Sequence, residues 1–211
     1  MIGKEQSYTE FRERWRGCQG CPLSSLRTQV VFGQGNLDAS LVMIGEAPGE
    51  QEDKFGKPFV GPAGESFNKL LAAVGLVRES LWITNTCLCR PKVDKPGKSN
   101  RAPNVKEIQA CFPRLYEELN IIKPKIIVLA GNTPLYLATQ KRGIMKNRGW
   151  QTDAKWVGDD FIAEHVFATL HPASLLYGTT EAIKEKKKAI FEDWLAIAAR
   201  MLNVTKTPKG I

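Results

Sequence analysis

Residues 41–64 read LVMIGEAPGEQEDKFGKPFVGPAG, and this stretch decides the fold class of the chain. It opens on an apolar run, residues 41–44, that is typical of a short strand buried in a sheet. The rest is rich in glycine, proline and acidic residues and exceeds an ordinary connection of about two to six residues. Loops at the carboxyl ends of such strands carry the chemistry of α/β folds. The stretch therefore predicts an α/β protein with its functional loop here, the alternative being a plain strand-to-helix connection.

Further apolar segments alternate with helical patterns along the chain. Strands are predicted at residues 81–84, 126–130 and 166–170, with a possible edge strand at residues 28–32. Caps and helical spacing predict helices at residues 64–75 and 181–202, from Ser7 to Arg16, after Asn104 and from Thr133. Trp150, Trp156 and Phe161 mark an irregular segment or a β-hairpin.

This alternation of strands and helices predicts a mostly parallel sheet that is covered on both faces. We expect a single domain over residues 1–211, with residues 203–211 as a frayed tail. Parallel strands point the same way, so their carboxyl ends share one edge of the sheet. That edge is expected to collect the loop of Glu46, Asn85 and His171, which lie far apart in the sequence.

Charge and composition narrow the class of protein. The net charge is +8 and 43% of the residues are hydrophobic, which is enough for a full core. No run approaches the roughly 18 apolar residues of a membrane span. The start of the chain lacks the apolar core of a secretory signal, which predicts a cytoplasmic protein. Lys and Arg cluster at residues 92–101, 141–148 and 184–188, which suits a polyanion such as nucleic acid, although solvated faces explain such runs equally well.

The five cysteines suggest a metal or redox role. Cys18 and Cys21 share one tight turn, Cys87 and Cys89 follow the strand at residues 81–84, and Cys111 lies on a predicted helix. Disulfides are rare inside cells. Four thiolates from these places could close a zinc site or hold an iron–sulfur cluster, and spacing does not choose between them. The simpler alternative is separate buried cysteines and one chance pair.

Three motifs carry a resemblance to a known family. GEAPGEQED and GKPFVGPAG in residues 45–64, ITNTCLCRP at residues 83–91 and HPAS at residues 171–174 resemble the family 4 uracil-DNA glycosylases, the iron–sulfur members of their superfamily. The resemblance implies a three-layer α/β/α sandwich around a four-stranded parallel sheet. It also implies a monomeric DNA repair enzyme that flips uracil out of single- or double-stranded DNA and hydrolyses its N-glycosidic bond, leaving an abasic site.

The resemblance assigns the recognition of uracil to three side chains. Phe59 would stack on the base, unless it is an ordinary core residue. Asn85 would read the O4 and N3–H edge of uracil, because an amide offers one donor and one acceptor. The alternative for Asn85 is a cap or turn at the end of a strand. His171 would donate to uracil O2 and stabilise the departing anion.

The first motif would supply the remaining catalytic and substrate-binding residues. Glu46 resembles the acidic residue that positions the attacking water. Ala47 lies beside the substrate, where family 1 enzymes have a water-activating aspartate, so Glu46, Asn85 or electrostatics alone must take over that duty. Glu52 resembles the residue that closes the pocket beside uracil C5, where thymine carries its methyl group.

The resemblance also accounts for the cysteines and for a DNA wedge. It assigns a [4Fe–4S] cluster to Cys18, Cys21, Cys89 and Cys111 and leaves Cys87 over, either as a packed thiol or as a backup ligand. The apolar pair Leu175 and Leu176 would wedge into the duplex. Tyr177 stands where many relatives have Arg, a departure that bears on wedge efficiency or strand preference. The basic loop at residues 92–104 would contact phosphate through Lys95, Lys98 and Arg101.

Two rival functions remain open at the level of sequence. One is a catalytically weak or inactive protein of the same fold that binds a lesion or a nucleic-acid end without cleaving it. The other is a zinc-bound nucleotide-handling protein. The presence of Glu46, Asn85 and His171 favours the uracil-DNA glycosylase over the binding protein.

Overall fold

The computed structural model of the chain describes residues 3–95, 98–154 and 163–206. Four parallel strands form the centre of its main sheet, in the spatial order β3 (Trp82–Asn85), β2 (Leu41–Gly45), β6 (Ile126–Ala130) and β8 (His165–Thr169). Two-residue antiparallel strands, β1 (Gln34–Gly35) and β7 (Gly149–Trp150), extend the sheet beyond β3 and β8. The predicted four-stranded parallel sheet is confirmed, and the short edge strands make the complete sheet mixed.

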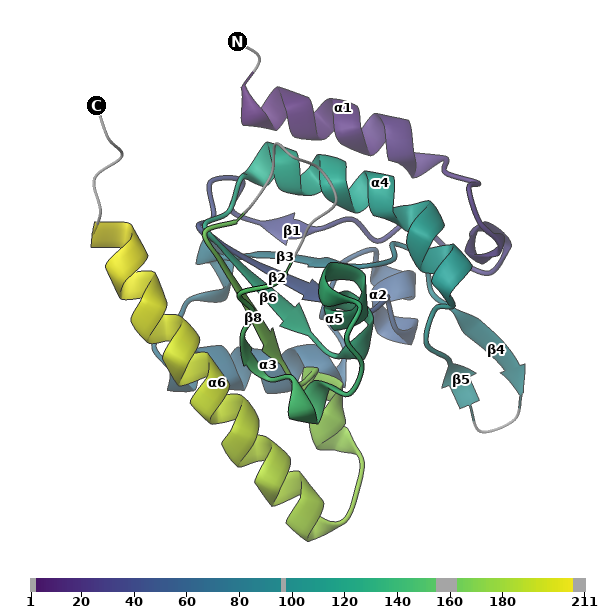
Figure 1. Ribbon diagram of the computed structural model, residues 1–211. Helices are drawn as coiled ribbons and strands as arrows, with labels where there is room; N and C mark the ends of the chain where they lie inside the picture. The colour runs from purple at the N-terminus through teal and green to yellow at the C-terminus, as the bar shows by residue number, and fades with distance from the viewer. Residues whose placement is uncertain (1–2, 96–97, 155–162, 207–211) are drawn as a thin grey trace.

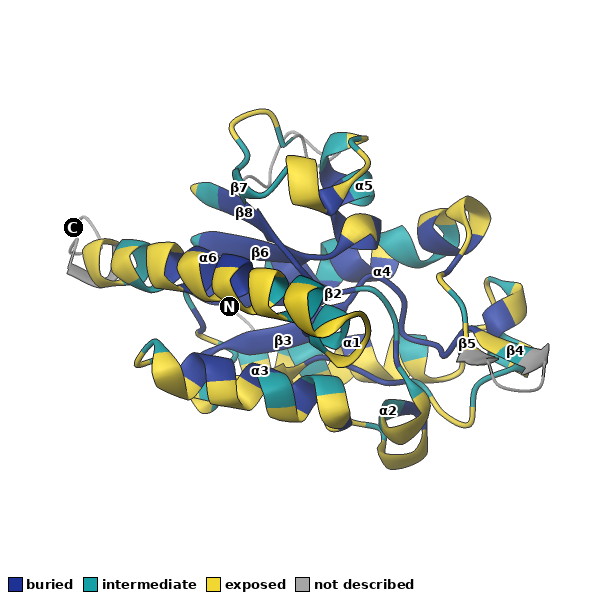
Figure 2. Ribbon diagram, turned by 90° about the horizontal axis from the view of Figure 1, so that it is seen from below, coloured by how far each residue is buried: buried dark blue, intermediate teal, exposed yellow. Residues whose placement is uncertain are grey.

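Helices cover both faces of this sheet (Figure 1). α4 (Val105–Ile122) lies over one face, and α1 (Lys4–Arg16) packs against it. α3 (Pro62–Ala73) and α6 (Thr180–Lys206) lie over the other face and contact each other. Because both faces are covered, every residue of β2, β3 and β6 is buried, and Figure 2 shows these strands in dark blue between helices with exposed outer surfaces. The predicted three-layer α/β/α class is confirmed.

The remaining elements are short and lie in the connections. They are α5 (Asn132–Thr139), which follows β6, α2 (Glu50–Phe55), the hairpin strands β4 (Lys92–Lys95) and β5 (Lys98–Asn100), and the 3₁₀ helices η1 (Pro22–Ser25), η2 (Arg78–Ser80), η3 (Ile144–Lys146) and η4 (Pro172–Leu176). No helix in the described part of the chain is long and apolar enough to cross a membrane.

Two hydrophobic clusters stabilise the fold. The larger one joins the four central strands to α3, α4 and α6, where for example the rings of Phe67 and Trp194 lie 5.0 Å apart. The smaller one lies under the N-terminal segment and consists of Phe11, Leu23, Phe32, Cys87, Leu88, Cys89 and Ile108. This N-terminal cluster anchors α1 and the turn of Cys18 and Cys21 to the rest of the molecule.

Three local predictions were wrong. Residues 28–32 form no strand, because they cross the loop after β3 and make single contacts there, such as Val31 N–H to the Leu88 carbonyl at 3.0 Å. α1 begins before Ser7, whose hydroxyl donates to the Gly3 carbonyl at 3.2 Å inside the helix instead of capping it. The stretch at residues 45–64, expected to be a loop, contains the short helix α2.

Other predictions were right in outline. The capping box of Asn104 and Glu107 opens α4, with the Glu107 amide 3.0 Å from Asn104 Oδ1. Trp150 belongs to β7, whereas Trp156 and Phe161 lie outside the described residues. α6 continues to Lys206, so residues 203–206 of the expected frayed tail are helical instead, and residues 207–211 lie outside the described part.

The order of the strands determines where a ligand can bind. The chain passes from β2 to β3 in one direction across the sheet and then returns past β2 to β6 in the other direction. Connections that leave β2 and β6 therefore diverge, and Figure 2 shows α3 and α5 on opposite sides of the strands. A crevice opens at such a switch point, at the carboxyl ends of the strands.

Candidate active site

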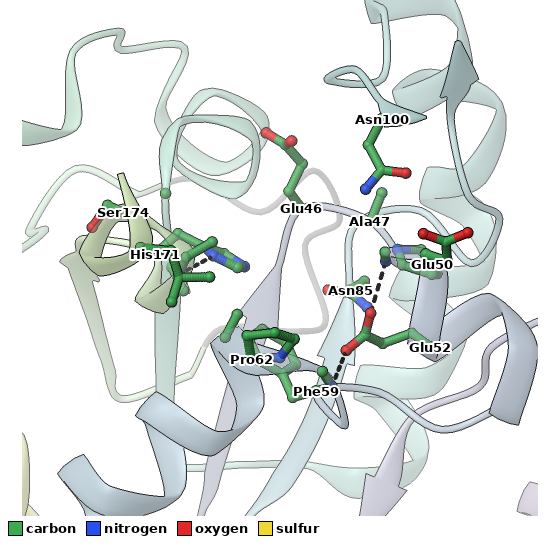
Figure 3. Close-up of a pocket in the computed structure, with 18 of the residues that line it drawn as sticks. Glu46, Ala47, Glu50, Glu52, Phe59, Pro62, Asn85, Asn100, His171 and Ser174 are labelled. Carbon is green, nitrogen blue, oxygen red and sulfur yellow. Dashed lines mark hydrogen bonds between the residues drawn. The ribbon is translucent and has the colours of Figure 1, made fainter. Parts of the chain in front are cut away.

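A cavity of about 590 Å³ lies at the carboxyl edge of the sheet, beside the switch point. It is lined by all the residues to which the sequence assigned catalysis or uracil binding, namely Glu46, Ala47, Glu52, Phe59, Asn85 and His171. Figure 3 shows that these side chains come from the ends of several strands and from the loop after β2, with the Glu46 carboxylate turned away from Phe59 and Asn85. A volume of this size lies within the range of small-molecule sites, about 300 to 1,000 Å³.

Asn85 is the last residue of β3, and its side chain is buried. The residue is 2% exposed, and its Oδ1 atom is buried with no hydrogen-bond partner in the described part of the chain. Gly45 lies opposite on β2, and a Cβ atom added there would fall 2.4 Å from Asn85 Oδ1 and 2.7 Å from Phe59 Cζ. Glycine at position 45 therefore makes room for the amide. A buried polar atom without a partner is costly unless a ligand supplies one.

Phe59 is held in an unusual backbone conformation. Its φ is 53°, in the left-handed region that residues other than glycine rarely adopt. Its ring is buried and stacks on His171, with ring centroids 5.3 Å apart and planes inclined by 29°. Gly64 approaches so closely that a Cβ atom there would lie 1.9 Å from the Phe59 carbonyl oxygen. The packing of Gly64 and His171 against Phe59 therefore holds this residue in its strained backbone conformation.

Glu52 supplies part of that support. Its carboxylate accepts backbone N–H groups from Gly49 at 3.1 Å, Val60 at 3.0 Å and Gly61 at 2.8 Å. These bonds close α2 onto the segment after Phe59 (Figure 3). Glu52 lines the cavity, and its contacts in the structure belong to the loop that carries Phe59.

His171 follows β8 and has a defined tautomer. Its Nδ1 atom accepts the backbone N–H of Ala173 at 3.1 Å, so the proton of a neutral ring lies on Nε2. Burial lowers the pKa of His171 to about 4, which keeps the imidazole neutral near pH 7. The ring points into the cavity (Figure 3). The structure thus presents one neutral N–H donor to a ligand.

Glu46 and Thr133 meet across the switch point. Glu46 follows β2, Thr133 lies in the first turn of α5 after β6, and the Thr133 hydroxyl donates to Glu46 Oε2 at 2.5 Å. Burial raises the pKa of Glu46 above its usual range, while the Thr133 hydrogen bond acts in the opposite direction. This contact fixes the carboxylate at the cavity wall.

The two leucines of the expected wedge have different surroundings. Leu175 is partly buried and packs against the large hydrophobic cluster, away from the cavity lining. Leu176 and Tyr177 line the cavity mouth and are 39% and 73% exposed. Lys186 holds this turn on α6 by donating to the carbonyls of Ser174 at 3.3 Å and Tyr177 at 3.1 Å.

A second, small cavity brings the cysteines together. Its lining includes Cys18, Cys21, Cys89 and Cys111, whereas Cys87 is not part of it. Cys87 is 1% exposed and belongs to the N-terminal hydrophobic cluster. All five thiols are free, and across the described ranges no three ligating side chains are arranged to hold a single metal ion.

The donors around this cavity suit anionic sulfur. Arg27 Nη1 lies 3.2 Å from Cys89 Sγ, the Gly20 N–H lies 3.5 Å from Cys18 Sγ, and Arg114 Nη2 lies 3.8 Å from Cys111 Sγ. Hydrogen bonds of this kind surround the sulfurs of iron–sulfur sites. Four thiols with two guanidinium groups therefore fit a cluster of negative charge chemically.

Arg101 of the basic loop forms a forked pair with Glu107, at 2.8 Å and 2.7 Å. It also lines the large cavity, and 37% of its side chain is exposed. The side chains of Lys95 and Lys98 lie outside the described part of the structure. Sequence reasoning missed Thr133 and Arg114. The position of Thr133 just after a strand at the switch point was a usable signal for the former, whereas nothing in the helical pattern distinguished Arg114.

The fold and the cavity define a class of protein. An α/β/α sandwich that presents an amide, an aromatic face, a neutral imidazole donor and a carboxylate at one switch point is built to bind a planar polar ring and to act on a bond beside it. Comparison with known proteins makes this class specific.

The model of the uracil DNA glycosylase superfamily matches residues 32–195. The type-4 uracil-DNA glycosylase of Thermotoga maritima is 38% identical over 195 residues, which cover 92% of this chain and 94% of the relative. The type-4 uracil-DNA glycosylase of Sulfurisphaera tokodaii is 37% identical over 206 residues, covering 94% and 89%. A type-5 uracil-DNA glycosylase of Pyrobaculum aerophilum is 25% identical over 205 residues, covering 82% and 85%. The chain belongs to the uracil DNA glycosylase superfamily and, within it, to the type-4 family.

Proposed function

We propose that this protein is a DNA repair enzyme that removes uracil from DNA by hydrolysing its N-glycosidic bond. The observation that carries this proposal is the meeting of Asn85 Oδ1, which has no hydrogen-bond partner among the described residues, and the neutral His171 donor in one cavity. Uracil has an N–H donor that can reach the buried Asn85 oxygen, whereas cytosine presents no N–H at that ring nitrogen. Cytosine would therefore leave the buried Asn85 oxygen without a hydrogen-bond partner, and this cost is what rejects it.

Each residue has a role in the proposed reaction. The target nucleotide is flipped out of the stack at a cost of a few kcal/mol, and its base packs on Phe59. The Nε2–H of His171 donates to uracil O2, where negative charge develops as the glycosidic bond breaks. The sugar becomes cationic at the same time, and the Glu46 carboxylate, held by Thr133, orients the attacking water and stabilises that cation. A neutral donor suits this role because its hydrogen bond to uracil O2 becomes stronger as negative charge develops on that oxygen.

The test is uracil release from matched single- and double-stranded oligonucleotides. We expect the wild-type protein to release uracil, and His171→Ala to lower kcat by roughly 10² to 10³, as for other donors to a developing anion. Asn85→Ala should lose the preference for uracil over cytosine. His165→Ala is a matched control, because that ring lies on β8 against Trp150 and should leave release unchanged.

Two results would contradict these assignments. A wild-type protein that binds uracil-containing DNA but releases no uracil would make this chain a lesion-binding protein of the same fold. An Asn85→Ala variant that still prefers uracil would remove Asn85 as the reader of the base.

We further propose that Cys18, Cys21, Cys89 and Cys111 hold a [4Fe–4S] cluster. Such a cluster would join the N-terminal turn to the segment after β3 and to α4, which are the three places that supply its thiols. Iron, acid-labile sulfide and visible absorbance measured on anaerobically purified protein test this. Cys111→Ser should lose the iron and Cys87→Ser should keep it. A colourless, zinc-loaded protein would contradict the assignment.

Leu176, Ala47 and Glu52 take lesser roles in the proposal. Leu176 enters the duplex at the cavity mouth, while Leu175 supports it from the core. Ala47 and Glu52 contact the substrate from the first motif, Glu52 on the C5 side of uracil. We propose that the protein acts on single- or double-stranded DNA as a single-domain monomer in the cytoplasm, where its thiols stay reduced. Light scattering at micromolar concentration would reveal a dimer.

A further inference from the structure

A fully buried ion pair lies beneath the strand that ends in Asn85. Arg114 and Glu118 are neighbours on α4, both 0% exposed, and Arg114 Nη1 lies 2.6 Å from Glu118 Oε2. Neither residue lines the large cavity. The proposed reaction therefore uses neither of them directly, and their burial needs another explanation.

The contacts of this pair concentrate on β3 and its exit. Arg114 Nη2 donates to the carbonyl oxygens of Asn85 at 2.7 Å and Thr86 at 2.9 Å. Glu118 accepts the Thr84 hydroxyl at 2.8 Å and the Trp82 indole N–H at 3.2 Å. The two side chains thus form hydrogen bonds along β3, from Trp82 to Thr86, the residue after Asn85.

These contacts continue past the end of the edge strand β1, which pairs with Trp82 and Ile83 only. On the side of β2 the backbone bonds run on beyond Asn85, from the Thr86 N–H to the Gly45 carbonyl at 2.9 Å and from the Cys87 N–H to the Glu46 carbonyl at 3.1 Å. The guanidinium adds donors to the carbonyl oxygens of the same segment. Since Asn85 Oδ1 has no partner in the described structure, the amide is positioned through its backbone and its packing.

Net stability is a poor explanation for such a pair. Removing two charges from water is expensive, and replacing a buried ion pair by apolar residues of similar volume is often neutral or stabilising. A planar guanidinium can, however, hold two carbonyl oxygens and a carboxylate in one fixed geometry. The ion pair instead holds the end of β3 in one position.

We propose that Arg114 is a positioning residue for uracil recognition, which fixes the Asn85 backbone so that its amide meets the base. The inference rests on the proposed function. The same guanidinium lies 3.8 Å from Cys111 Sγ, so it also joins the reading strand to the wall of the cysteine cavity. Arg114 touches neither the base nor the reacting atoms.

The test uses Arg114→Lys, which keeps the charge beside Glu118 and loses the planar fork. Arg148→Lys is the matched control, because Arg148 also forms a forked pair, with Asp193 at 2.9 Å and 3.0 Å, but holds α6 instead of β3. The probe is an oligonucleotide whose uracil is attached to 2′-fluorodeoxyribose, in which the fluorine slows departure of the base. Its affinity is compared with that of the same oligonucleotide carrying cytosine, and kcat and KM are measured on the ordinary uracil substrate.

We expect Arg114→Lys to lose about tenfold to a hundredfold of its preference for the uracil probe, because displacement of about 1 Å at a binding group has effects of that size. Uracil release should fall by a similar factor, with affinity for undamaged DNA unchanged. Arg148→Lys should keep the wild-type preference even if its melting temperature falls.

The double variant Arg114→Met with Glu118→Leu guards against misfolding, since it removes both charges together. It should fold and show the same loss of preference. Wild-type preference in either variant that folds would overturn the proposal, as would an equal loss in Arg148→Lys. Failure of the wild-type protein to release uracil would refute the proposed function alone, because the preference for the uracil probe is measured by binding.

Discussion

Hydrogen bonding from the backbone determines what His171 can do. The Ala173 N–H fixes the tautomer, and burial keeps the ring neutral down to a pKa of about 4. The pKa of Glu46 is shifted in the opposite direction, because burial raises the pKa of its carboxyl above the usual value. On acidification from pH 7, Glu46 therefore takes up a proton before His171 does.

This order predicts the pH dependence of catalysis. As the pH falls through the raised pKa of Glu46, its carboxylate takes up a proton and loses the charge that orients water and stabilises the sugar cation. We expect the acid-side fall in kcat to have its midpoint above 4.5, the usual pKa of a Glu carboxyl. Glu46→Gln should be slower at neutral pH and should lack this limb down to about pH 5, where His171 is still neutral.

Rates from single-turnover experiments between pH 4.5 and 8 would check this prediction, with circular dichroism at each pH to confirm that the protein is folded. A Glu46→Gln variant with the same acid limb as the wild type would show that another group titrates.

Individual residues also show where sequence reasoning stops. Asn85 and His171 could be placed at one edge because they follow parallel strands, and the structure brings them into one cavity. Arg114 could not be found in this way, because its side chain lies on a helix that looks amphipathic whether or not one polar residue points inward. Packing between distant elements decides that direction.

At the scale of elements, regular patterns were predictable and irregular loops were not. The apolar runs of β2, β6 and β8 needed only their local composition to be recognised. Residues 28–32 have similar composition but find no free strand edge to pair with, since β1 takes that place on β3. α2 was hidden among turn residues because a six-residue helix depends on its cap and on tertiary contacts more than on propensity.

The connection between α2 and Phe59 gives a prediction for the loop. Glu52→Ala removes three hydrogen bonds from a charged acceptor to backbone N–H groups. Bonds to charged groups contribute about 1.5 to 3 kcal/mol each when buried, and Glu52 is partly exposed, so we expect a loss of roughly 2 to 3 kcal/mol in the free energy of unfolding. Because Phe59 would leave its left-handed conformation, KM for uracil DNA should rise more than kcat falls.

Urea unfolding and steady-state kinetics measure both effects. Glu65→Ala is the control, since Glu65 is an exposed carboxylate in the first turn of α3 that does not line the cavity. Equal KM values for Glu52→Ala and the wild type would mean that the Phe59 segment holds its position without this carboxylate.

The whole molecule carries an excess of positive charge, +8 over 211 residues. If three DNA phosphates are neutralised on binding, affinity for undamaged duplex should fall about 40-fold between roughly 50 and 200 mM salt, because each contact releases condensed counterions. Fluorescence anisotropy at several salt concentrations gives the slope. Single-turnover release at saturating protein should change little over the same range, since the cavity itself is shielded. A flat salt dependence would contradict a phosphate-binding surface.

The N-terminal hydrophobic cluster separates two parts of the molecule along the sequence. The superfamily match begins at residue 32, whereas Cys18, Cys21 and the anchoring residues Phe11 and Leu23 come before it. Every residue that lines the large cavity lies inside the matched region. A chain that began at residue 32 would therefore lose two of the four thiols of the cysteine cavity and yet keep every residue of the large one.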